Sequence, residues 1–486
     1  MKKLDFRAEA AIVAMAPPAT SSGDGDVPKI VETLEFALRA LSASSATPEE
    51  LAEIRRLLDG MRTSPALRAV EPVTPPRSHL PPLSAREPPL PRIATYSQGM
   101  HGFGHIRRNA TIAHALRDAG TQAVILMIAE AWQAGAIPMP EGVDCVTLPG
   151  LRKEANGGLN ARFLDVSDQE LITLRSKVIR KAIKTFQPDV LLVDYLPLGA
   201  GGELVRTLER VRKHGRTRCV LGLREVLQDP ETVRRTWSTD GWLDAMRDYY
   251  DAIWIYGDPA VFDPVREYGV FDGVASKVRY TGYLDQRQRL ELAGAQATQL
   301  VTNLPPPPAK LALCVVGGGV DGYALAEAFV AADLGSDTTG MIVTGPYMPP
   351  ESRHRLLESA QRNPRCEVLE FVPDPVPLIN RADRIIAMGG YNTICEVLSF
   401  EKHALIVPRV HPEPEQWIRA QRLRDLGLID VLHPDDLSPR ALSEWLARDL
   451  GPLPTHRSRV DVGGLTRIPT LLADLLNGAV TGTPTV

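Results

Sequence analysis

The sequence lacks several features that would assign a protein to a class at once. Its five cysteines are odd in number and form no CxxC pair, which argues for a reducing compartment and against a disulfide framework or a zinc site. No apolar run approaches the roughly 18 residues that would span a bilayer. The formal net charge of −4 provides no basic surface for nucleic acid, so we expect no nucleic-acid partner.

A secretory leader is not expected either. The first apolar run, "AAIVAMA", is short, and Asp5 and Glu9 interrupt its approach. The hydrophobic content of 44% and charged content of 23% are those of a globular protein, and 486 residues exceed one ordinary core. We therefore predict a cytoplasmic protein of two or three domains.

The N-terminal part differs in composition from the rest. Residues 1–70 begin with a segment predicted to be disordered, followed by a helical hairpin whose second helix starts at a Thr47–Glu50 capping box. So small a hairpin needs a surface to pack on, so we expect a docking or dimerisation extension that could form a homodimer. Residues 71–91 contain eight prolines and predict a semi-rigid linker.

From residue 92 onward, apolar strand patterns alternate with helical patterns. This alternation predicts doubly wound parallel sheets of the α/β class. It breaks at a polar stretch ending in "NLPPPPAK" and then restarts. The chain therefore divides into two Rossmann-like lobes, residues 92–295 and 296–486, and a site is expected in the cleft between them.

The first strand ends in "SQGMHGFGHIRR", residues 97–108. Its glycines do not follow GxGxxG, so a dinucleotide-binding fingerprint is not supported. His105 stands at the start of the following helix, where the helix dipole favours the neutral imidazole. Such a histidine could act as a general base, with a capping or hydrogen-bonding role as the alternative. Asp194 ends a later strand and is a second candidate, against a structural cap.

Two further glycine turns occur in the second lobe. Gly317–Gly319 in "CVVGGG" form a strand-to-helix turn that suits a phosphate or is only a tight turn. "AMGGYNTICE", residues 387–396, allows two interpretations. Asn392 or Thr393 caps the next helix, or the bare helix N-terminus binds phosphate while Glu396 holds a sugar hydroxyl.

Taken together, these motifs resemble those of the GT-B glycosyltransferases over residues 92–475. The second lobe is similar to glycosyltransferase family 28, in the branch that adds N-acetylglucosamine to the lipid-linked peptidoglycan precursor. "MGGYNTICE" also resembles the nucleotide-sugar signature of plant and antibiotic glycosyltransferases. Runs such as "YYDAIWIYGDP" and "VRYTGY" resemble a set of bacterial glycosyltransferase-family proteins.

The resemblance implies roles for particular residues. Glu396 would accept hydrogen bonds from the donor ribose, and His105 would be the candidate base or an acceptor-binding residue. The other implied donor-site residues would contact the diphosphate, the nucleobase or the sugar. Those for the diphosphate turn are Gly318, Gly319, Gly389, Gly390, Asn392 and Thr393; those for the base are Phe371 and Val372; and those for the sugar hydroxyls are Glu415 and Gln416. Met388 departs from the plant-type signature, which has a phosphate-contacting histidine there, so Arg409 is expected to assist instead.

We therefore predict transfer of a sugar from a nucleoside diphosphate donor, UDP-linked by resemblance, to an acceptor hydroxyl of a saccharide, lipid-linked or small-molecule acceptor. No DxD pair stands at a plausible strand end, so we expect no metal and no other cofactor; inversion is implied by the resemblance. "LRSKVIRKAIKTF" is a basic amphipathic helix that suits peripheral contact with the inner face of a membrane, or only the solvated face of a helix.

Two other functions stay open at this point. A nucleotide-sugar epimerase or hydrolase would share the architecture, but it would need several acids in the cleft and no acceptor site. The other is a non-catalytic scaffold whose helical hairpin recruits partners, with or without a bound nucleotide; retention of Glu396, both glycine turns and Glu415–Gln416 argues against it.

Overall fold

The computed structural model describes residues 90–99, 104–119, 123–130, 139, 141–153, 158–292, 301, 304, 309–372 and 374–478. All of them belong to one compact unit, Pro88–Val486. The predicted helical hairpin, the proline-rich linker up to residue 89 and the boundary at 295/296 lie outside the described residues.

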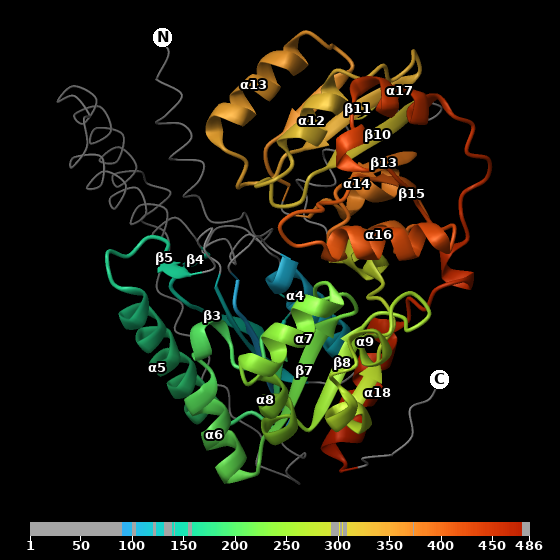
Figure 1. The fold of residues 1–486 in the computed structure, drawn as a ribbon. Coiled ribbons are helices and arrows are strands. Elements are labelled where there is room, and N and C mark those ends of the chain that lie inside the picture. The colour runs from blue at the N-terminus through green and yellow to red at the C-terminus, as the bar shows by residue number, and fades with distance from the viewer. Residues whose placement is uncertain are drawn as a thin grey trace, which may run out of the picture. The chain divides into compact units, whose positions relative to one another are not determined.

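The N-terminal lobe is built on a parallel sheet in the spatial order β3-β2-β1-β6-β7-β8-β9. Its strands are β1 (Arg92–Ser97), β2 (Val124–Ala129), β3 (Val143–Thr147), β6 (Val190–Asp194), β7 (Arg218–Arg224), β8 (Ala252–Tyr256) and β9 (Val278–Tyr280). Its longer helices are α4 (Gly104–Asp118), α5 (Asp168–Phe186), α6 (Val205–His214), α7 (Pro230–Thr239), α8 (Trp242–Tyr249) and α9 (Pro264–Tyr268). A hairpin of β4 (Leu151–Lys153) and β5 (Leu159–Ala161) is added before α5 (Figure 1).

The C-terminal lobe repeats this architecture, with a parallel sheet in the order β12-β11-β10-β13-β14-β15. Its strands are β10 (Lys310–Val315), β11 (Thr338–Val343), β12 (Cys366–Leu369), β13 (Arg384–Ala387), β14 (His403–Ile406) and β15 (Asp430–Val431). Its helices are α12 (Tyr323–Val330), α13 (Pro350–Gln361), α14 (Val376–Arg381), α15 (Tyr391–Ser399), α16 (Glu415–Asp425) and α17 (Pro439–Ala447). The predicted class, two doubly wound parallel α/β lobes, is confirmed.

The apolar strand runs are explained by burial on both sheet faces, because helices cover both sides of a doubly wound sheet. Successive residues of β1 belong to different cores. Ile93 packs with Val190 in one core, whereas Ala94 packs with Leu191 in another. Central strands such as β6 and β10 therefore show a continuous apolar run rather than an alternation.

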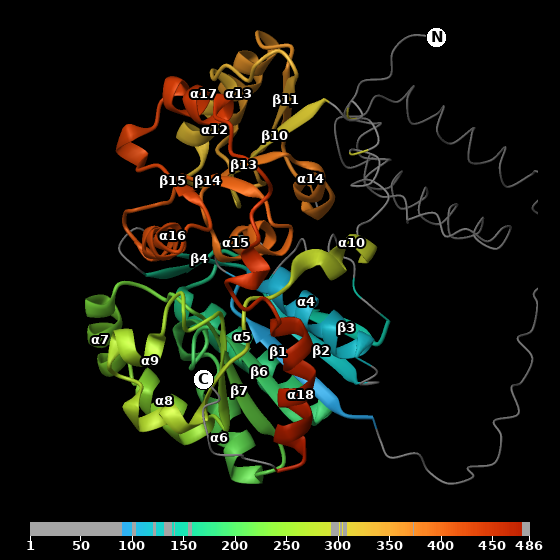
Figure 2. The ribbon, with the colours of Figure 1, turned by 90° about the vertical axis from the view of Figure 1, so that its right-hand side faces the viewer.

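The chain returns to the N-terminal lobe after completing the C-terminal sheet. Helix α18 (Gly464–Leu476) packs against α4, and Figure 2 shows it beside the N-terminal sheet. The return segment pairs with the first crossing, because Gly464 N donates to Tyr283 O at 3.0 Å and Leu284 bridges Gly463. Residues 464–476 fall within the predicted second lobe, 296–486, but they pack on the first lobe.

Candidate functional site

The motifs gather where each sheet reverses its strand order. In the N-terminal sheet the reversal lies between β1 and β6, and in the C-terminal sheet between β10 and β13. Ligands of doubly wound proteins bind beyond the carboxyl ends of the strands at such points. The glycine-rich loop follows β1, Asp194 ends β6, Gly317–Gly319 follow β10, and Gly389–Gly390 follow β13.

His105 and Asp194 form one unit in the N-terminal lobe. The Nδ1 atom of His105, on the first turn of α4, lies 2.6 Å from Oδ2 of Asp194. Arg108 lies one turn further along α4, and its Nη2 contacts both Asp194 carboxylate oxygens at 2.7 and 2.6 Å. The Asp194 side chain is 1% exposed and that of His105 is 18% exposed. Asp194 is therefore placed as the partner of His105 rather than as a separate base.

The electrostatics of this unit favour a neutral imidazole. Burial lowers the pKa of His105 below its ordinary value, although Asp194 opposes that shift. Burial alone would raise the pKa of Asp194, but Arg108 and His105 outweigh it and the pKa falls. With Nδ1–H donated to the carboxylate, Nε2 is the nitrogen that can accept a proton.

Helix α15 begins directly beyond β13 and carries no side-chain cap. Gly389 has φ +81°, and a Cβ there would lie 2.6 Å from Ile406 Cγ2, so the turn requires glycine. Gly390 is the N-cap, and a Cβ there would meet no atom within 4 Å. Neither Asn392 nor Thr393 caps the helix. The first-turn N–H groups of α15 therefore receive no side-chain cap, and such an uncapped helix N-terminus can bind an anion.

Asn392 instead joins the two lobes. Its Nδ2 donates to the main-chain oxygen of Gly104 at 3.0 Å, and Gly104 immediately precedes His105. The contact brings the start of α15 next to the start of α4, so the two helix N-termini and the histidine share one site.

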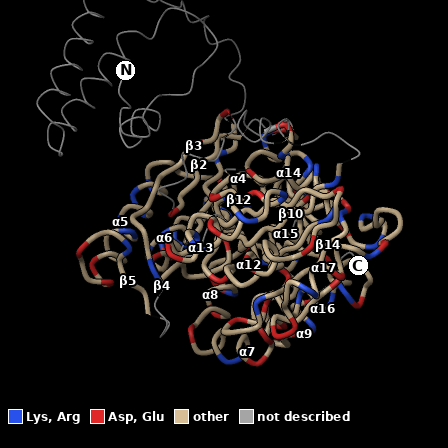
Figure 3. The backbone as a smooth tube through the Cα atoms, turned by 90° about the horizontal axis from the view of Figure 1, so that it is seen from above, with Lys and Arg blue, Asp and Glu red and all other residues tan. Residues whose placement is uncertain are grey.

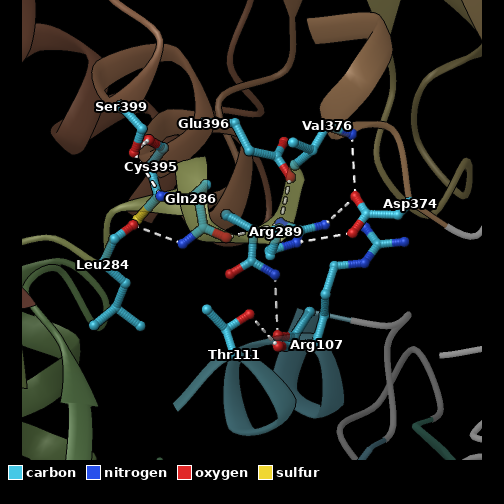
Figure 4. A network of polar contacts seen from close by, with 12 residues as sticks. Arg107, Thr111, Leu284, Gln286, Arg289, Asp374, Val376, Cys395, Glu396 and Ser399 are labelled. Atoms are coloured by element: carbon cyan, nitrogen blue, oxygen red, sulfur yellow. Dashed lines mark hydrogen bonds and ion pairs between the residues drawn. The ribbon is translucent and has the colours of Figure 1, made fainter. Parts of the chain in front are cut away.

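Glu396 is buried, 2% exposed, and is held by a residue that sequence analysis missed. Its Oε1 accepts from Arg289 Nη1 at 2.9 Å. Arg289 also contacts Asp374, at 2.6 Å from Nη2 to Oδ1, and Gln286 Oε1 at 2.7 Å (Figure 4). Burial raises the pKa of Glu396 although Arg289 opposes the shift. The predicted ribose-binding carboxylate is thus paired with an arginine of the inter-lobe segment in this structure.

The residues predicted to bind the nucleobase lie close in sequence to Asp374, which belongs to the network of Glu396 and Arg289. Phe371 is half-buried and Val372 is buried, in the segment between β12 and α14. Two residues on, Asp374 receives the Arg289 guanidinium and also the main-chain N–H of Val376 at 3.0 Å. The predicted base-binding segment and Glu396 are therefore linked through one arginine.

The glycines after β10 have a packing role. Gly318 O accepts from Tyr347 N at 2.9 Å, and Gly319 N donates to Val316 O at 3.3 Å. A Cβ on Gly345, after β11, would lie 2.3 Å from Gly317 O. A Cβ on Gly319, which has φ +92°, would lie 2.3 Å from Thr344 O, so close packing of the two turns requires glycine there. The diphosphate role of Gly318 and Gly319 stays a prediction.

Arg409, which was predicted to assist at the diphosphate, forms several ion pairs in the C-terminal lobe. Its guanidinium pairs with three carboxylates, Asp321 at 3.2 Å, Glu413 at 3.3 Å and Glu415 at 3.0 Å. Its main-chain N–H donates to Gln416 Oε1 at 3.1 Å. Arg409 therefore orients Glu415 and Gln416, and its charge is already compensated.

Comparisons with known proteins give this geometry a context. Residues 312–456 match the family model of the glycosyltransferase family 28 C-terminal domain. The chain is 24% identical over 353 residues to the UDP-N-acetylglucosamine–N-acetylmuramyl-(pentapeptide) pyrophosphoryl-undecaprenol N-acetylglucosamine transferase of Cronobacter sakazakii, covering 71% of this chain and 85% of the relative.

Solved structures share the fold. A structure of the kitacinnamycin glycotransferase has a TM-score of 0.53 at 16% identity, covering 80% of this chain and all of the other. The S. aureus MnaA–UDP structure has a TM-score of 0.55 at 13% identity, covering 82% of this chain and all of the other. The two lobes and their facing switch points define the GT-B class, and the chain is a GT-B glycosyltransferase. Residues 312–456 of its C-terminal lobe are the part that matches the family 28 model.

Proposed function

We propose that this glycosyltransferase moves a sugar from a UDP-linked donor to an acceptor hydroxyl, with inversion and without a metal, and that His105 is the general base. The observation that carries the proposal is the His105–Asp194 pair, held by Arg108 and joined to the start of α15 through the Asn392–Gly104 bond. This arrangement puts a proton acceptor next to an uncapped helix N-terminus.

The proposed chemistry is a single displacement. The acceptor hydroxyl gives its proton to Nε2 of His105 while its oxygen bonds to the sugar C1. The bond between C1 and the phosphate oxygen breaks, and the electron pair leaves with the diphosphate. The first-turn N–H groups of α15 would stabilise the charge that develops there, and Asp194 would stabilise the imidazolium.

The donor assignment draws support from the relatives. The Cronobacter transferase is named for a UDP-N-acetylglucosamine donor, and the MnaA structure contains UDP. Within this chain, the uncapped α15 and the network of Glu396, Arg289 and Asp374 supply the anion-binding and polar groups that such a donor needs.

The acceptor of that Cronobacter relative is lipid-linked by its name, and we propose peripheral contact of this chain with an anionic membrane. Large apolar side chains are exposed around the start of α5, namely Phe163 at 69%, Leu164, Val166 and Leu174. Exposed basic residues follow along α5, namely Lys177, Arg180, Lys181 and Lys184, as in a basic amphipathic interfacial helix. Figure 3 marks the Lys and Arg positions of the chain in blue. In the part of the chain that the structure describes, no helix is both long and apolar enough to traverse a bilayer.

His105→Ala tests the proposed function. We expect turnover to fall by about 10²–10⁴-fold with nearly unchanged UDP affinity, because a general base acts on the acceptor and not on the nucleotide. The matched control is His354→Ala, which removes a 75% exposed histidine of α13. The low-pH limb of the parent's rate should have a midpoint below 6.5, since the pKa of His105 is lowered, and this limb should be absent in the variant.

Incubation of the parent with a UDP-sugar and no acceptor separates transfer from epimerisation. Rapid formation of a new UDP-sugar epimer would favour an epimerase of the same fold. Unchanged turnover of His105→Ala would move the base role to another residue.

A further inference from the structure

Arg224 is the last residue of β7, at the same sheet edge as the His105–Asp194 pair. Strand β7 pairs with β6, so the carboxyl ends of the two strands that carry Asp194 and Arg224 are adjacent. The Arg224 guanidinium carbon lies 5.1 Å from the ring centroid of Tyr195, and the Tyr195 ring lies 6.1 Å from that of His105. Arg224 therefore stands next to the proposed base, on the acceptor side of the site.

Arg224 differs from the other arginines of this region because no acidic side chain among the described residues forms an ion pair with it. Arg108 has Asp194, Arg409 has three carboxylates, and Arg419 takes Glu225, the residue next to Arg224. No carboxylate among the described residues pairs with Arg224, and its buried Nε has no hydrogen-bond partner there.

A half-buried cation without a counter-ion is costly unless a ligand supplies one. The planar guanidinium fork matches a carboxylate or phosphate in two-point geometry. Because the described chain offers no anion for this fork, an anionic ligand group would satisfy both the charge and the orphaned Nε.

The ring of Tyr195 packs against the Arg224 guanidinium. Tyr195 has φ +71°, in the left-handed region that a tyrosine rarely adopts, and such backbone strain is concentrated at functional sites. Burial raises the pKa of Tyr195, with Glu413 and Glu415 adding to the shift and Arg224 opposing it. Arg409 is shared by Asp321, Glu413 and Glu415, and none of these carboxylates forms an ion pair with Arg224.

We propose that Arg224 and Tyr195 form an anion subsite for the acceptor, which carries a carboxylate or a phosphate close to the hydroxyl that His105 deprotonates. The inference rests on the proposed function and adds a substrate class to it. The acceptor anion would be held by the Arg224 fork against the Tyr195 ring, and the same contact would orient the hydroxyl toward Nε2 of His105.

Binding measurements on the full chain test this subsite without a known acceptor. The probes are inorganic phosphate and succinate, titrated by calorimetry in the presence of saturating UDP so that the donor position is filled. We expect Arg224→Gln to weaken binding of the preferred probe by about tenfold or more, since it removes a charge-assisted two-point contact. Arg224→Lys should recover only part of the affinity, because an ammonium lacks the fork. Whichever probe binds more tightly, inorganic phosphate or succinate, identifies the acceptor group as a phosphate or a carboxylate.

Controls separate the subsite from fold and donor effects. Arg210→Gln removes an exposed arginine of α6 and should change nothing, and thermal unfolding of each variant without probe checks folding. His105→Ala should keep the anion binding even though it loses turnover, so failure of the base role and failure of the subsite are distinguishable. Absence of saturable anion binding by the parent in the presence of UDP would overturn the proposal. An equal loss of UDP affinity in Arg224→Gln would overturn it too, by assigning Arg224 to the donor diphosphate.

Discussion

The buried ion pair between Arg419 and Glu225 should be a principal contact between the two lobes. Arg419 belongs to α16 and Glu225 follows β7, and both side chains are 0% exposed with 2.7 Å between Nε and Oε1. Tyr283 OH donates to the same Oε1 at 2.9 Å. In Arg419→Met the carboxylate stays buried and keeps the Tyr283 hydrogen bond at that oxygen, but its desolvation is no longer compensated by a cation.

The magnitude follows from that geometry. Removing one partner of a buried pair typically costs about 3–5 kcal/mol, and the lower end applies because the tyrosine hydrogen bond is kept. A loss of about 3 kcal/mol corresponds to a roughly hundredfold increase in the open population of this interface. Hydrogen exchange of the α16 amides, measured under native conditions, should accelerate by that factor if opening limits the exchange.

The chain contains a matched control on the same helix. Arg422 pairs with Glu267 at 3.1 Å, but its side chain is 44% exposed. Arg422→Met should therefore change α16 protection by less than about 1 kcal/mol, as is usual for exposed pairs. Equal effects of the two variants would refute the reasoning, because burial would then not decide the value of an inter-lobe pair.

Two further predictions concern buried carboxylates. Glu396→Ala should weaken UDP binding by about 1–3 kcal/mol in calorimetry, the cost of leaving ribose hydroxyls unpaired, and parent-like affinity would make Glu396 a structural partner of Arg289 only. Burial raises the pKa of Glu130 from 4.5 to about 7 despite Arg175 at 3.0 Å. The unfolded chain then binds fewer protons than the folded chain between those values, so stability falls as pH rises through this window. Thermal unfolding at pH 5 and pH 8 should show a smaller decline in Glu130→Gln, and an identical decline would exclude this titration.

The strands and the glycine turns were predictable because their signals are local. Many buried strands are short apolar runs that end at an acid or within two residues of a glycine, as in β1, β6 and β13. Helix α5 starts earlier than the basic run suggested, at a Ser167–Glu170 capping box that was present in the sequence. Strand β3 was missed because its residues are only partly buried at the sheet edge.

The site was predictable only in part, for a physical reason. His105 was found from its place at the start of a helix and Asp194 from its place at a strand end, but their pairing joins residues 89 positions apart. Arg289 contacts Glu396 over 107 positions and comes from a polar segment with no motif of its own. No local pattern encodes such contacts, because the first depends on how α4 packs on the N-terminal sheet and the second on how the two lobes pack.

The return of α18 to the first lobe determines how this enzyme can be divided. A fragment covering residues 296–486 would carry the apolar face of α18, including Leu465, Ile468 and Leu472, without the α4 surface that buries it. The complementary fragment 92–295 would expose that α4 surface in turn. Expressed singly, both pieces should be prone to aggregation, whereas co-expression should let them associate through the shared helix. A donor lobe expressed alone for ligand screening should therefore end before Gly464.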